Sequence, residues 1–357
     1  GGIEGSKFGA GFFLTKNSLK INGKDAEPEW ISSFELGLTA PVIKERLFAF
    51  AAVSIPYDGL YEIKSKEITE PDFVFLSERN KRLVLLAGLS VKVSDNFSLG
   101  AGFSLLPDVI GGVNVDFASA NPQNSHTVDV NYNLAPVLGA MFSAKSLKIG
   151  LAYRGAQHTE IKIPVKTVIS DKILPINLEV SSSAYSTPHQ FALGIYHELL
   201  ENLVWAFDVT YYRFSDFTQA SPSVYLFDSG GAVIQSSEVG EGDFSDVFVP
   251  RLGIEYSTDK FAVRGGYSYF RSPVPRQTGA ANMLDSDRNT LSIGSGFSLD
   301  RIFGFTIPVE VNLHVQFSFL NRNEDGKELF FPENPGFPAI QSEGYFINAG
   351  MNVEVGL

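Results

Sequence analysis

The sequence predicts an all-β protein: a transmembrane, antiparallel, up-and-down β-barrel of about 14 strands. Three observations lead to this prediction. Apolar residues alternate with small or polar residues from end to end, and helical periodicity is almost absent. Along the chain, short connections between the expected strands alternate with long ones. Several segments are far longer than the usual strand of about five or six residues, as tilted membrane strands have to be.

The clearest strand is "TIPVEVNLHVQFSFL", residues 306–320. Every second residue from Ile307 to Phe319 is apolar, and the residues between them include Glu310 and His314. Because alternate side chains of a strand point to opposite faces, the segment has one apolar and one polar face. We expect the apolar face to contact lipid and the polar face to line the lumen, since a charge facing lipid costs roughly 2–4 kcal/mol at mid-depth.

The same pattern predicts the other strands. In chain order, the expected strands lie near residues 7–15, 31–41, 46–56, 82–92, 96–117, 126–143, 147–167, 175–197, 202–218, 246–257, 260–271, 287–299, 306–320 and 344–357. Outward apolar faces are clearest at Phe97, Leu99, Ala101, Phe103, Leu105; Leu147, Ile149, Leu151, Tyr153; Phe191, Leu193, Ile195; and Ile347, Ala349, Met351, Val353, Val355, Leu357. The opposite faces of these strands are small or polar.

The connections separate the barrel from its alternatives. The short ones are residues 43–46, 94–96, 144–146, 199–202, 257–260 and 299–304; the long ones are 16–30, 57–81, 118–125, 168–174, 219–245, 272–286 and 321–343. An outer-membrane barrel has its short turns on the periplasmic side and its long loops outside. A soluble sandwich has no reason to segregate loop length in this way, and a propeller would show a repeat of about 40–50 residues. An even strand number places both termini on the short-turn side.

Composition excludes several other functions. The net charge of -12 argues against non-specific nucleic-acid binding. The absence of cysteine removes disulfides, thiolate nucleophiles and cysteine metal sites. No stretch of about 18 consecutive apolar residues is present, so no transmembrane helix is expected. The first residues, "GGIEGSKFGA", carry no signal peptide, and we expect one barrel over residues 1–357.

Several segments resemble the FadL-type long-chain fatty acid transporters. The resemblance is carried by "VPRLGIEYSTDKFAVRGGYSYFRSPVP" (249–275), "LDSDRNTLSIGSGFSL" (284–299), "QSEGYFINAGMNVEV" (341–355), "LFAFAAVSIPYDGLYEI" (47–63), "LKIGLAYRG" (147–155) and "VWAFDVTYYRFSDF" (204–217). It covers nearly the whole chain at low identity. The resemblance implies a fourteen-stranded barrel that takes up hydrophobic molecules passively, through an apolar lumen pocket with a sideways exit at a kinked third strand.

The chain departs from this family at two places. The family's N-terminal hatch, with its Asn-Pro-Ala motif, does not precede the first expected strand in this sequence, so we expect either that the hatch has been trimmed or lost or that the lumen is closed differently. The loops 118–125 and 168–174, which in the family help to form an outer capture groove, are short. Loops 57–81 and 219–245 are the expected replacement, through Phe73, Phe75, Tyr225 and Phe227.

The segment "AAVSIPYDG" (51–59) occupies the position of the kinked third strand. Pro56 cannot donate a ladder hydrogen bond, and proline in sheets is confined to edges, ends and bulges. One interpretation is a sideways exit formed by Ser54, Ile55, Pro56, Tyr57 and Gly59, where pairing between the second and third strands breaks. The other is that the strand simply ends there.

The predicted ligand-binding residues are basic and face the lumen. Arg154, Arg251 and Arg264 lie on three different strands, and His314 lies on a fourth. An arginine fork suits a carboxylate ligand. The alternative is a ladder of salt bridges in the lumen, formed with Glu160, Glu255 or Glu310. Arg154 also matches a Tyr-Arg position of the resembling family.

No catalytic, metal or cofactor site is expected. The five histidines are scattered without metal-ligand spacing. His158 and Ser170 could share a rim by position alone, and nothing else supports a nucleophile there. We interpret Asp285, Asp287 and Arg288, at the start of a strand, as residues that cap a loop.

The predicted function is a passive channel in the bacterial outer membrane for hydrophobic compounds, with long-chain fatty acids as the expected substrates. The expected partners are outer-membrane lipid, lipopolysaccharide and the hydrophobic ligand, with no nucleic acid and with a monomeric protein. The alternatives are a general porin for polar solutes and a structural or adhesin barrel. A closed apolar cavity favours the first function, and a continuous water-filled channel favours the porin.

Overall fold

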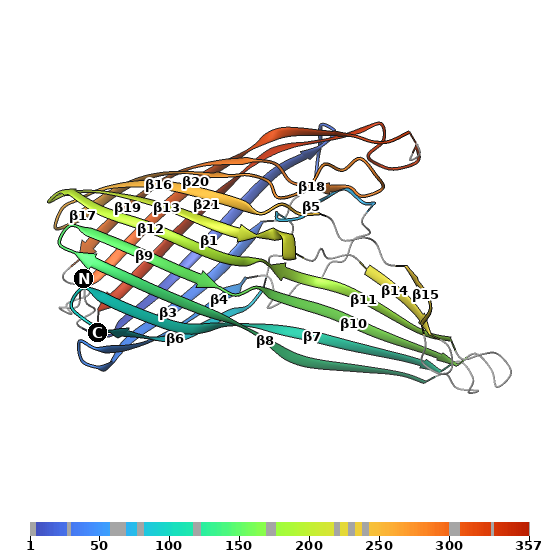
Figure 1. Ribbon diagram of the computed structural model, residues 1–357, viewed down its shortest axis with the longest axis horizontal. Helices are drawn as coiled ribbons and strands as arrows, with labels where there is room; N and C mark the ends of the chain where they lie inside the picture. The colour runs from blue at the N-terminus through green and yellow to red at the C-terminus, as the bar shows by residue number, and fades with distance from the viewer. Residues whose placement is uncertain are drawn as a thin grey trace.

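A closed wall of 14 antiparallel strands forms the protein, as predicted (Figure 1). The computed structural model describes residues 5–26, 30–57, 69–76, 82–116, 123–168, 176–217, 222–227, 233–237, 243–299, 308–329 and 332–356, with only the backbone of those within 107–131, 159–185 and 222–237. Each wall strand pairs with the next along the chain. The first and last strands pair from Lys7–Gly356 to Ile21–Ser342, and this pairing closes the barrel.

The wall strands, in order, are β1 (Lys7–Ile21), β3 (Ile31–Ile43), β4 (Leu47–Pro56), β6 (Val84–Lys92), β7 (Phe97–Asp116), β8 (Gln123–Ala144), β9 (Leu147–Arg154), β12 (His189–Leu200), β13 (Leu203–Arg213), β16 (Val247–Ser257), β17 (Phe261–Phe270), β19 (Arg288–Leu299), β20 (Val309–Gly326) and β21 (Ala339–Gly356). The other elements are β2 (Lys24–Asp25), β5 (Asp72–Phe73), β10 (Gln157–Val168), β11 (Ile176–Thr187), the 3-10 helix η2 (Phe214–Asp216), β14 (Pro222–Phe227), β15 (Val233–Ser237) and β18 (Met283–Leu284). No helix in the described part of the chain is long and apolar enough to cross a membrane.

Both chain ends lie at the short-turn end of the barrel, as the even strand number predicts (Figure 1). At the opposite end, β7 and β8 rise beyond the wall and join β10, β11, β14 and β15 in a projecting arm, at the lower right of Figure 1. The arm is not a simple continuation of the wall, because β10 pairs in parallel with β7 and β11 pairs with β14. The predicted connections 118–125 and 168–174 fall largely outside the described residues.

The arm corrects two of the predicted strands. The segment 147–167 is two strands, β9 and β10, interrupted at Gly155, and the segment 175–197 is divided at Pro188. The Gly155 amide donates to the Pro136 carbonyl at 2.8 Å, and a Cβ at Gly155 would come within 2.7 Å of the Pro136 ring. The chain therefore leaves the wall where only glycine fits, and periodicity alone could not show this break.

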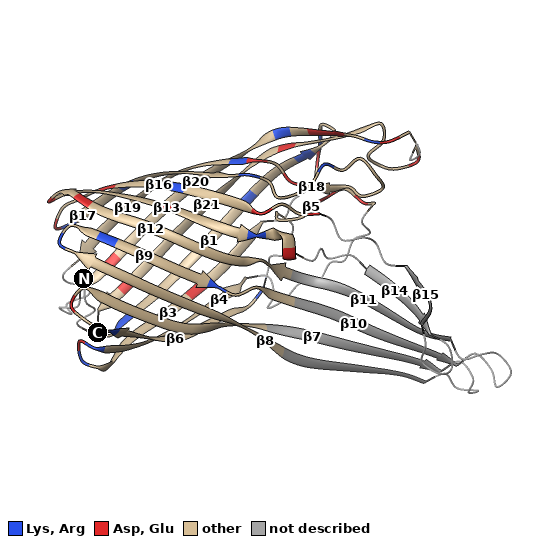
Figure 2. Ribbon diagram, viewed as in Figure 1, with Lys and Arg blue, Asp and Glu red and all other residues tan. Residues whose placement is uncertain are grey.

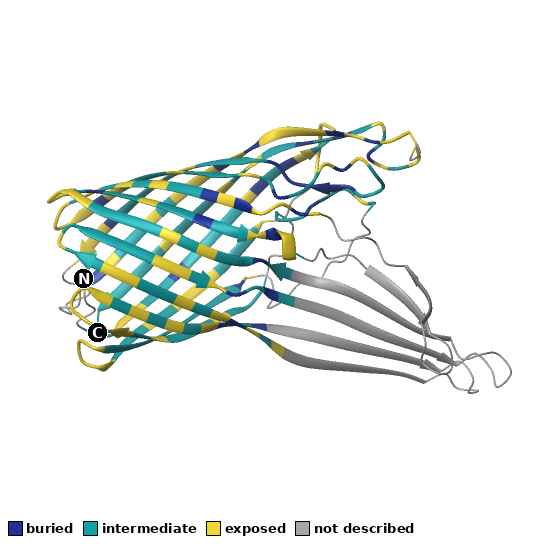
Figure 3. Cartoon of the chain, in the orientation of Figure 1, coloured by how far each residue is buried: buried dark blue, intermediate teal, exposed yellow. Residues whose placement is uncertain are grey.

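The two faces of the wall confirm the predicted division. On β20, Leu313, Val315 and Phe317 are exposed on the outer face, and their neighbours in sequence point inward. Figure 3 shows the resulting alternation of exposed and partly buried residues along the wall strands. Toward the long-loop end the outer face gathers aromatic pairs, including Tyr211–Phe248 and Phe317–Tyr345 with ring centroids 4.9 and 5.5 Å apart. Aromatic girdles mark the interfaces of membrane barrels.

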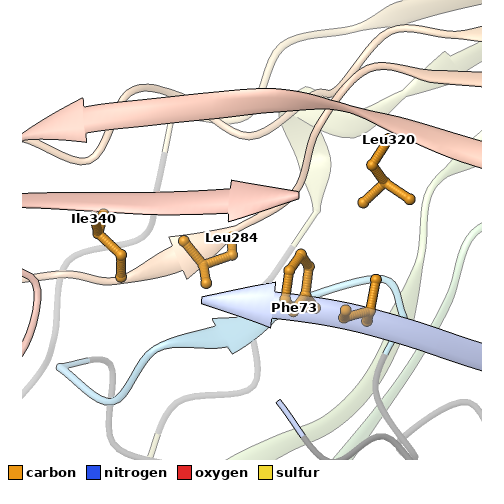
Figure 4. Close-up of a cluster of buried hydrophobic side chains, with 5 residues drawn as sticks. Phe73, Leu284, Leu320 and Ile340 are labelled. Carbon is orange, nitrogen blue, oxygen red and sulfur yellow. The ribbon is translucent and has the colours of Figure 1, made fainter. Parts of the chain in front are cut away.

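Buried apolar clusters fill the mouth of the barrel at the long-loop end. Segments 69–76 and 277–286 meet there through β5 and β18, which pair in parallel, and we call these two segments the mouth plug. Phe73 and Leu284 pack against the inward-facing Leu19, Leu320 and Ile340 of the wall (Figure 4). On the other side of the plug, the second cluster consists of Phe214, Phe244, Val247, Val249 and Met283, with Phe75 and Phe270 packed against it.

The predicted break between the second and third wall strands does not occur at residues 54–57. Pairing of β3 with β4 continues to Ser33–Pro56, and the Tyr57 amide donates to the Ser32 carbonyl at 2.9 Å. Pairing of β4 with β6 does end, at Ser54–Val84. Proline is tolerated at position 56 because it lies at the end of its strand, and Gly59 lies outside the described residues.

Candidate functional site

A cavity of about 650 Å³, lined by charged, polar and apolar residues, opens on the inner wall formed by β13, β16, β17, β19 and β20. Arg251, Arg264 and His314 all line this cavity, so the structure brings together three of the predicted site residues. Its upper end meets the apolar clusters of the mouth, because Val249 and Phe270 belong to both. Figure 2 shows that the wall strands are mostly uncharged, with isolated basic and acidic residues among them.

Arg251 is held by three neighbours on β13. Its Nη1 donates to Asp208 Oδ1 and to Thr210 Oγ1, both at 2.8 Å, and its Nη2 donates to the Tyr212 hydroxyl at 3.2 Å. Strand register explains the arrangement, because Asp208 stands directly opposite Arg251 and both residues point inward. The guanidinium is therefore already matched by a carboxylate.

Arg264 is matched in the same way. Its Nε donates to Glu255 Oε2, the residue directly opposite on β16, and its Nη1 donates to Asn312 Oδ1 at 2.8 Å. A Cβ at Gly296 would come within 2.7 Å of that amide oxygen and 3.1 Å of Nη1, so a glycine leaves room for the contact. The predicted salt-bridge ladder is thus confirmed for Arg264 and Glu255.

His314 packs against an aromatic ring and a glycine. Its ring centroid lies 5.3 Å from that of Phe13 on β1. A Cβ at Gly350 would lie 2.4 Å from the imidazole Cε1, so the absence of a side chain at Gly350 lets the ring lie flat on β21. His314 therefore lies between the lumen cavity and Phe13 of β1.

Arg154 lies apart from the cavity and is paired with nothing that the structure describes. It is exposed on the inner face of β9, and no hydrogen bond or ion pair joins it to a described residue. Strand register places it beside Gln190 of β12, and Gln190 beside Tyr212 of β13. Tyr212 packs against the Phe214–Phe244–Val247 cluster at the mouth. Only β12 therefore separates Arg154 from a residue that contacts this apolar cluster.

The mouth plug is held by a buried amide. Asn282 is fully buried, and its Nδ2 donates to the Thr69 carbonyl at 2.6 Å and to Asn334 Oδ1 at 2.7 Å. Backbone bonds from Asp72 to Asn282 and from Val74 to Leu284 complete the parallel pair. Phe73 and Phe75, predicted to form a capture surface, instead pack into the mouth; the side chains of Tyr225 and Phe227 lie outside the described residues.

Two apolar hollows lie on the outside of the wall. One of about 890 Å³ follows outward residues such as Leu99, Leu151 and Leu193, and one of about 590 Å³ follows Leu313 and Met351. Both belong to the lipid-facing belt rather than to the lumen. The apolar lumen pocket implied by the family resemblance therefore stays a prediction, since charged and polar residues share the lining of the described lumen cavity with apolar ones.

Sequence reasoning missed the residues that hold Arg251. Asp208, Thr210 and Tyr212 sit at alternate positions of "VWAFDVTYYR", so their common inward face could have been recognised. Of the predicted partners, Glu310 stands opposite Glu354, and the side chain of Glu160 lies outside the described residues. Within the described ranges, no group of three or more His, Cys, Asp or Glu residues could hold a metal ion.

The comparisons with known proteins agree on one family. A family model described as "Outer membrane protein transport protein (OMPP1/FadL/TodX)" matches residues 81–324. Alkane uptake protein A of Marinobacter nauticus is 34% identical over 101 residues, a stretch that spans 27% of this chain and 22% of the relative.

Solved structures share the fold at low identity. A FadL homologue of Pseudomonas aeruginosa superposes with a TM-score of 0.60 at 14% identity, covering 99% of this chain and 89% of the other. The toluene transporter TodX of P. putida superposes with a TM-score of 0.58 at 15% identity, covering 99% and 90%. At this identity the superpositions establish the barrel architecture.

Proposed function

Because the chain belongs to the OMPP1/FadL/TodX family of outer membrane transport proteins, we propose that it is a passive channel for hydrophobic compounds, with long-chain fatty acids as its substrates. The observation that carries the fatty-acid assignment is Arg154, a lumen guanidinium without a partner in the described part of the chain. A carboxylate is the ligand that an arginine fork accepts best. The acyl chain needs no cofactor, since transfer from water to an apolar site yields roughly 0.8 kcal/mol per methylene.

The position of Arg154 suits an amphiphile. Along one row of the inner wall, Arg154 and Gln190 offer polar contacts, and Tyr212 leads to the aromatic cluster around Phe214 and Phe244. A fatty acid with its carboxylate on Arg154 would direct its chain toward that cluster. Arg251 and Arg264 are not the proposed carboxylate site, because each already has an opposing acid. His314 stays a proposed lining residue.

Uncharged hydrocarbons are the second candidate. The matched charges of the main cavity favour a neutral ligand, and a 34% identical stretch is shared with a protein named for alkane uptake. A general porin is the third candidate, favoured by the charged and hydrogen-bonding side chains in the lining of that cavity. We also retain the proposals that the protein is a monomer and that it contacts outer-membrane lipid and lipopolysaccharide.

The sideways exit is proposed on the β6 side of Pro56. The Tyr57 amide points to β3, so the position of the missing amide at residue 56 faces β6 instead. Pairing of β4 with β6 stops two residues earlier, at Ser54–Val84. Ser54, Ile55, Pro56 and Tyr57 would then border the gap; Gly59, the other predicted exit residue, lies outside the described residues.

The test compares binding of two ligands to purified protein in amphipol: oleate, and an alkane of similar length. Arg154→Gln should weaken oleate binding about tenfold or more, because a hydrogen bond to a charged group contributes about 1.5–3 kcal/mol. Alkane binding should not change. The matched control is Arg213→Gln, an exposed guanidinium at the end of β13 that already pairs with Asp216 at 3.0 Å.

Each outcome points to one candidate. Equal oleate binding by parent and Arg154→Gln, with tight alkane binding, would favour the hydrocarbon channel. Large steady conductance in planar bilayers, with neither ligand bound, would favour the porin. Heat-modifiable mobility on gels should report the same folded fraction for all variants.

A further inference from the structure

A second cavity, of about 450 Å³, lies at the rim of the barrel, above the start of β19. Its walls are the loop that follows β17, the residues just before β19, and the part of β20 that rises beyond the wall. Three arginines line it, together with amide and hydroxyl groups: Arg271, Arg276, Arg322, Ser272, Asn321 and Asn323. It is separate from the lumen cavity, with which it shares no lining residue.

The arginines of the rim cavity are largely uncommitted. Arg322 donates from Nη2 to the neutral Gln341 Oε1 at 2.7 Å. Arg271 is exposed, and no ion pair joins it to a residue in the described ranges. Arg276 lies 3.5 Å from Asp325 Oδ1, and its side chain is 79% exposed. Two guanidinium groups therefore face the cavity without a counter-charge, and the third has only a loose one.

The carboxylates of the same cavity are occupied or buried. Asp287 accepts from the Ser272 amide at 2.8 Å and from the Tyr269 hydroxyl at 2.5 Å. Asp325 Oδ2 accepts from the Gln277 amide at 3.1 Å. Asp285 is fully buried, and burial raises the pKa of its carboxyl, which favours the neutral form. None of these acids forms an ion pair with Arg271 or Arg322, so these two guanidinium groups stay available, and with Asp285 neutral three guanidinium groups stand against two carboxylates.

The rim cavity lies at the level of the outer-leaflet headgroups. On the outer face, the Tyr267 hydroxyl donates to Asn289 Oδ1 at 2.7 Å, and Asn289 Nδ2 donates to Asn321 Oδ1 at 3.3 Å. This polar chain begins in the aromatic belt and ends in the cavity wall. Immediately below it, the outer face carries Leu291 and Phe319, which are exposed to lipid. From the apolar belt outward, the side chains thus change from tyrosine to amides to arginines, which is the order expected across a membrane interface.

We propose that the rim cavity binds a phosphate group of an outer-leaflet glycolipid, the phosphorylated lipid A part of lipopolysaccharide. Guanidinium groups bind phosphate with paired, charge-assisted hydrogen bonds, and Ser272, Asn321 and Asn323 supply further donors. The cavity opens above the lipid-facing belt, so the acyl chains of the same molecule would lie along Leu291 and Phe319. This inference rests on the proposed contact with lipopolysaccharide and gives it a site, and it does not depend on which compound crosses the lumen.

The test measures binding of lipid A to the folded full chain in amphipol, by native mass spectrometry and by fluorescence titration. The double variant Arg271→Gln, Arg322→Gln should bind phosphorylated lipid A about tenfold more weakly or worse than the parent. Arg213→Gln, which changes an exposed guanidinium at the end of β13 that is already paired with Asp216 and does not line the cavity, should bind like the parent. EDTA is present throughout, so that binding through a bridging divalent cation is removed.

Two further probes identify the source of the phosphate. Dephosphorylated lipid A should bind the parent weakly and should not distinguish the variants. Inorganic phosphate at millimolar concentration should fail to displace the lipid. Unchanged lipid A binding by the folded double variant, or equal binding of the dephosphorylated lipid, would overturn the proposal. Displacement by inorganic phosphate would assign the cavity to a free anion instead of a lipid.

Discussion

Two stretches of the inner wall use the same residue type in different ways. On the side formed by β13, β16 and β17, Arg251 and Arg264 each stand opposite a carboxylate on the neighbouring strand. On the side formed by β9 and β12, Arg154 stands opposite Gln190 and Val137. Whether a lumen arginine is held in an ion pair or is available to bind a ligand thus depends on the residue directly opposite it on the neighbouring strand. This opposing residue is set by register, not by the arginine itself.

The energies explain why both arrangements persist. The Arg251–Asp208 and Arg264–Glu255 pairs are only about half buried, so each contributes on the order of 0–1 kcal/mol. Arg154 faces the open lumen, where water can hydrate its charge at little cost. Leaving one guanidinium unpaired therefore costs the barrel little and keeps a binding group available.

The largest expected effect comes from giving Arg154 the partner that it lacks. Gln190→Glu places a carboxylate directly opposite Arg154, as Glu255 stands opposite Arg264. Oleate binding should fall about tenfold to hundredfold, because the ligand then competes with a fixed counter-charge. A titration with labelled oleate measures this.

The matched control for that variant is Gln190→Asn, which keeps the position neutral. Because an amide remains beside Arg154, oleate binding should fall far less than in Gln190→Glu. If Gln190→Glu also leaves oleate binding intact in folded protein, Arg154 does not receive the carboxylate.

The converse change should create a weaker site on the other side. Asp208→Asn removes the counter-charge of Arg251 and keeps the size of the side chain, while Thr210 and Tyr212 still hold the guanidinium. Binding of a carboxylate ligand should rise severalfold, on the order of 1 kcal/mol, and the gain should disappear at high salt. Alkane binding serves as the control, and a parallel rise in alkane binding would show a change in cavity shape instead.

Much of the wall could be predicted from sequence, and the reasons are physical. Lipid on one side and water on the other impose a strict alternation, which is why segments such as 306–320 gave the strands and their faces. The pair Arg264–Glu255 followed from the same alternation. The partner of Arg251 did not, because alternation assigns Asp208 a face but not a neighbour. That requires the register across a 33-residue loop between β13 and β16.

The mouth could not be predicted in the same way. Segments 69–76 and 277–286 have no period of their own, and they meet through two backbone hydrogen bonds and one buried amide. Such contacts join distant parts of the chain without leaving a local pattern. For the same reason, the sequence predicts Phe73 and Phe75 to form a capture surface, whereas in the structure they pack into the mouth.

A smaller effect is expected at a carboxyl group that is buried rather than hydrated. Asp285 follows the plug strand β18 directly, and burial raises its pKa. The folded protein therefore holds this proton more tightly than the unfolded chain does. The resulting stability is complete at pH values below the ordinary range of aspartate and is lost as the pH rises through the folded pKa.

Asp285→Asn should remove this pH dependence and make the mouth plug slightly more stable at pH 8 than in the parent. Hydrogen exchange at the Val74 amide, which pairs with Leu284, reports the opening of the plug. At pH 5 the two proteins should differ less than at pH 8. A variant that is less protected than the parent at pH 8 would show that the ionised carboxylate stabilises the plug.

The smallest effect concerns the exit and separates it from the binding step at Arg154. Pairing of β4 with β3 is intact through Pro56, so only the β6 side of this strand can open. Pro56→Val restores an amide donor toward β6 and should narrow the proposed gap without altering the lumen. Oleate uptake by cells matched for expression should slow by on the order of twofold, while oleate binding to the purified variant stays at the parental level. Because Arg154→Gln changes binding first and uptake as a consequence, the two variants should be distinguishable in the same pair of assays. Uptake that is unchanged in Pro56→Val would mean that Pro56 only ends its strand and that the substrate leaves elsewhere.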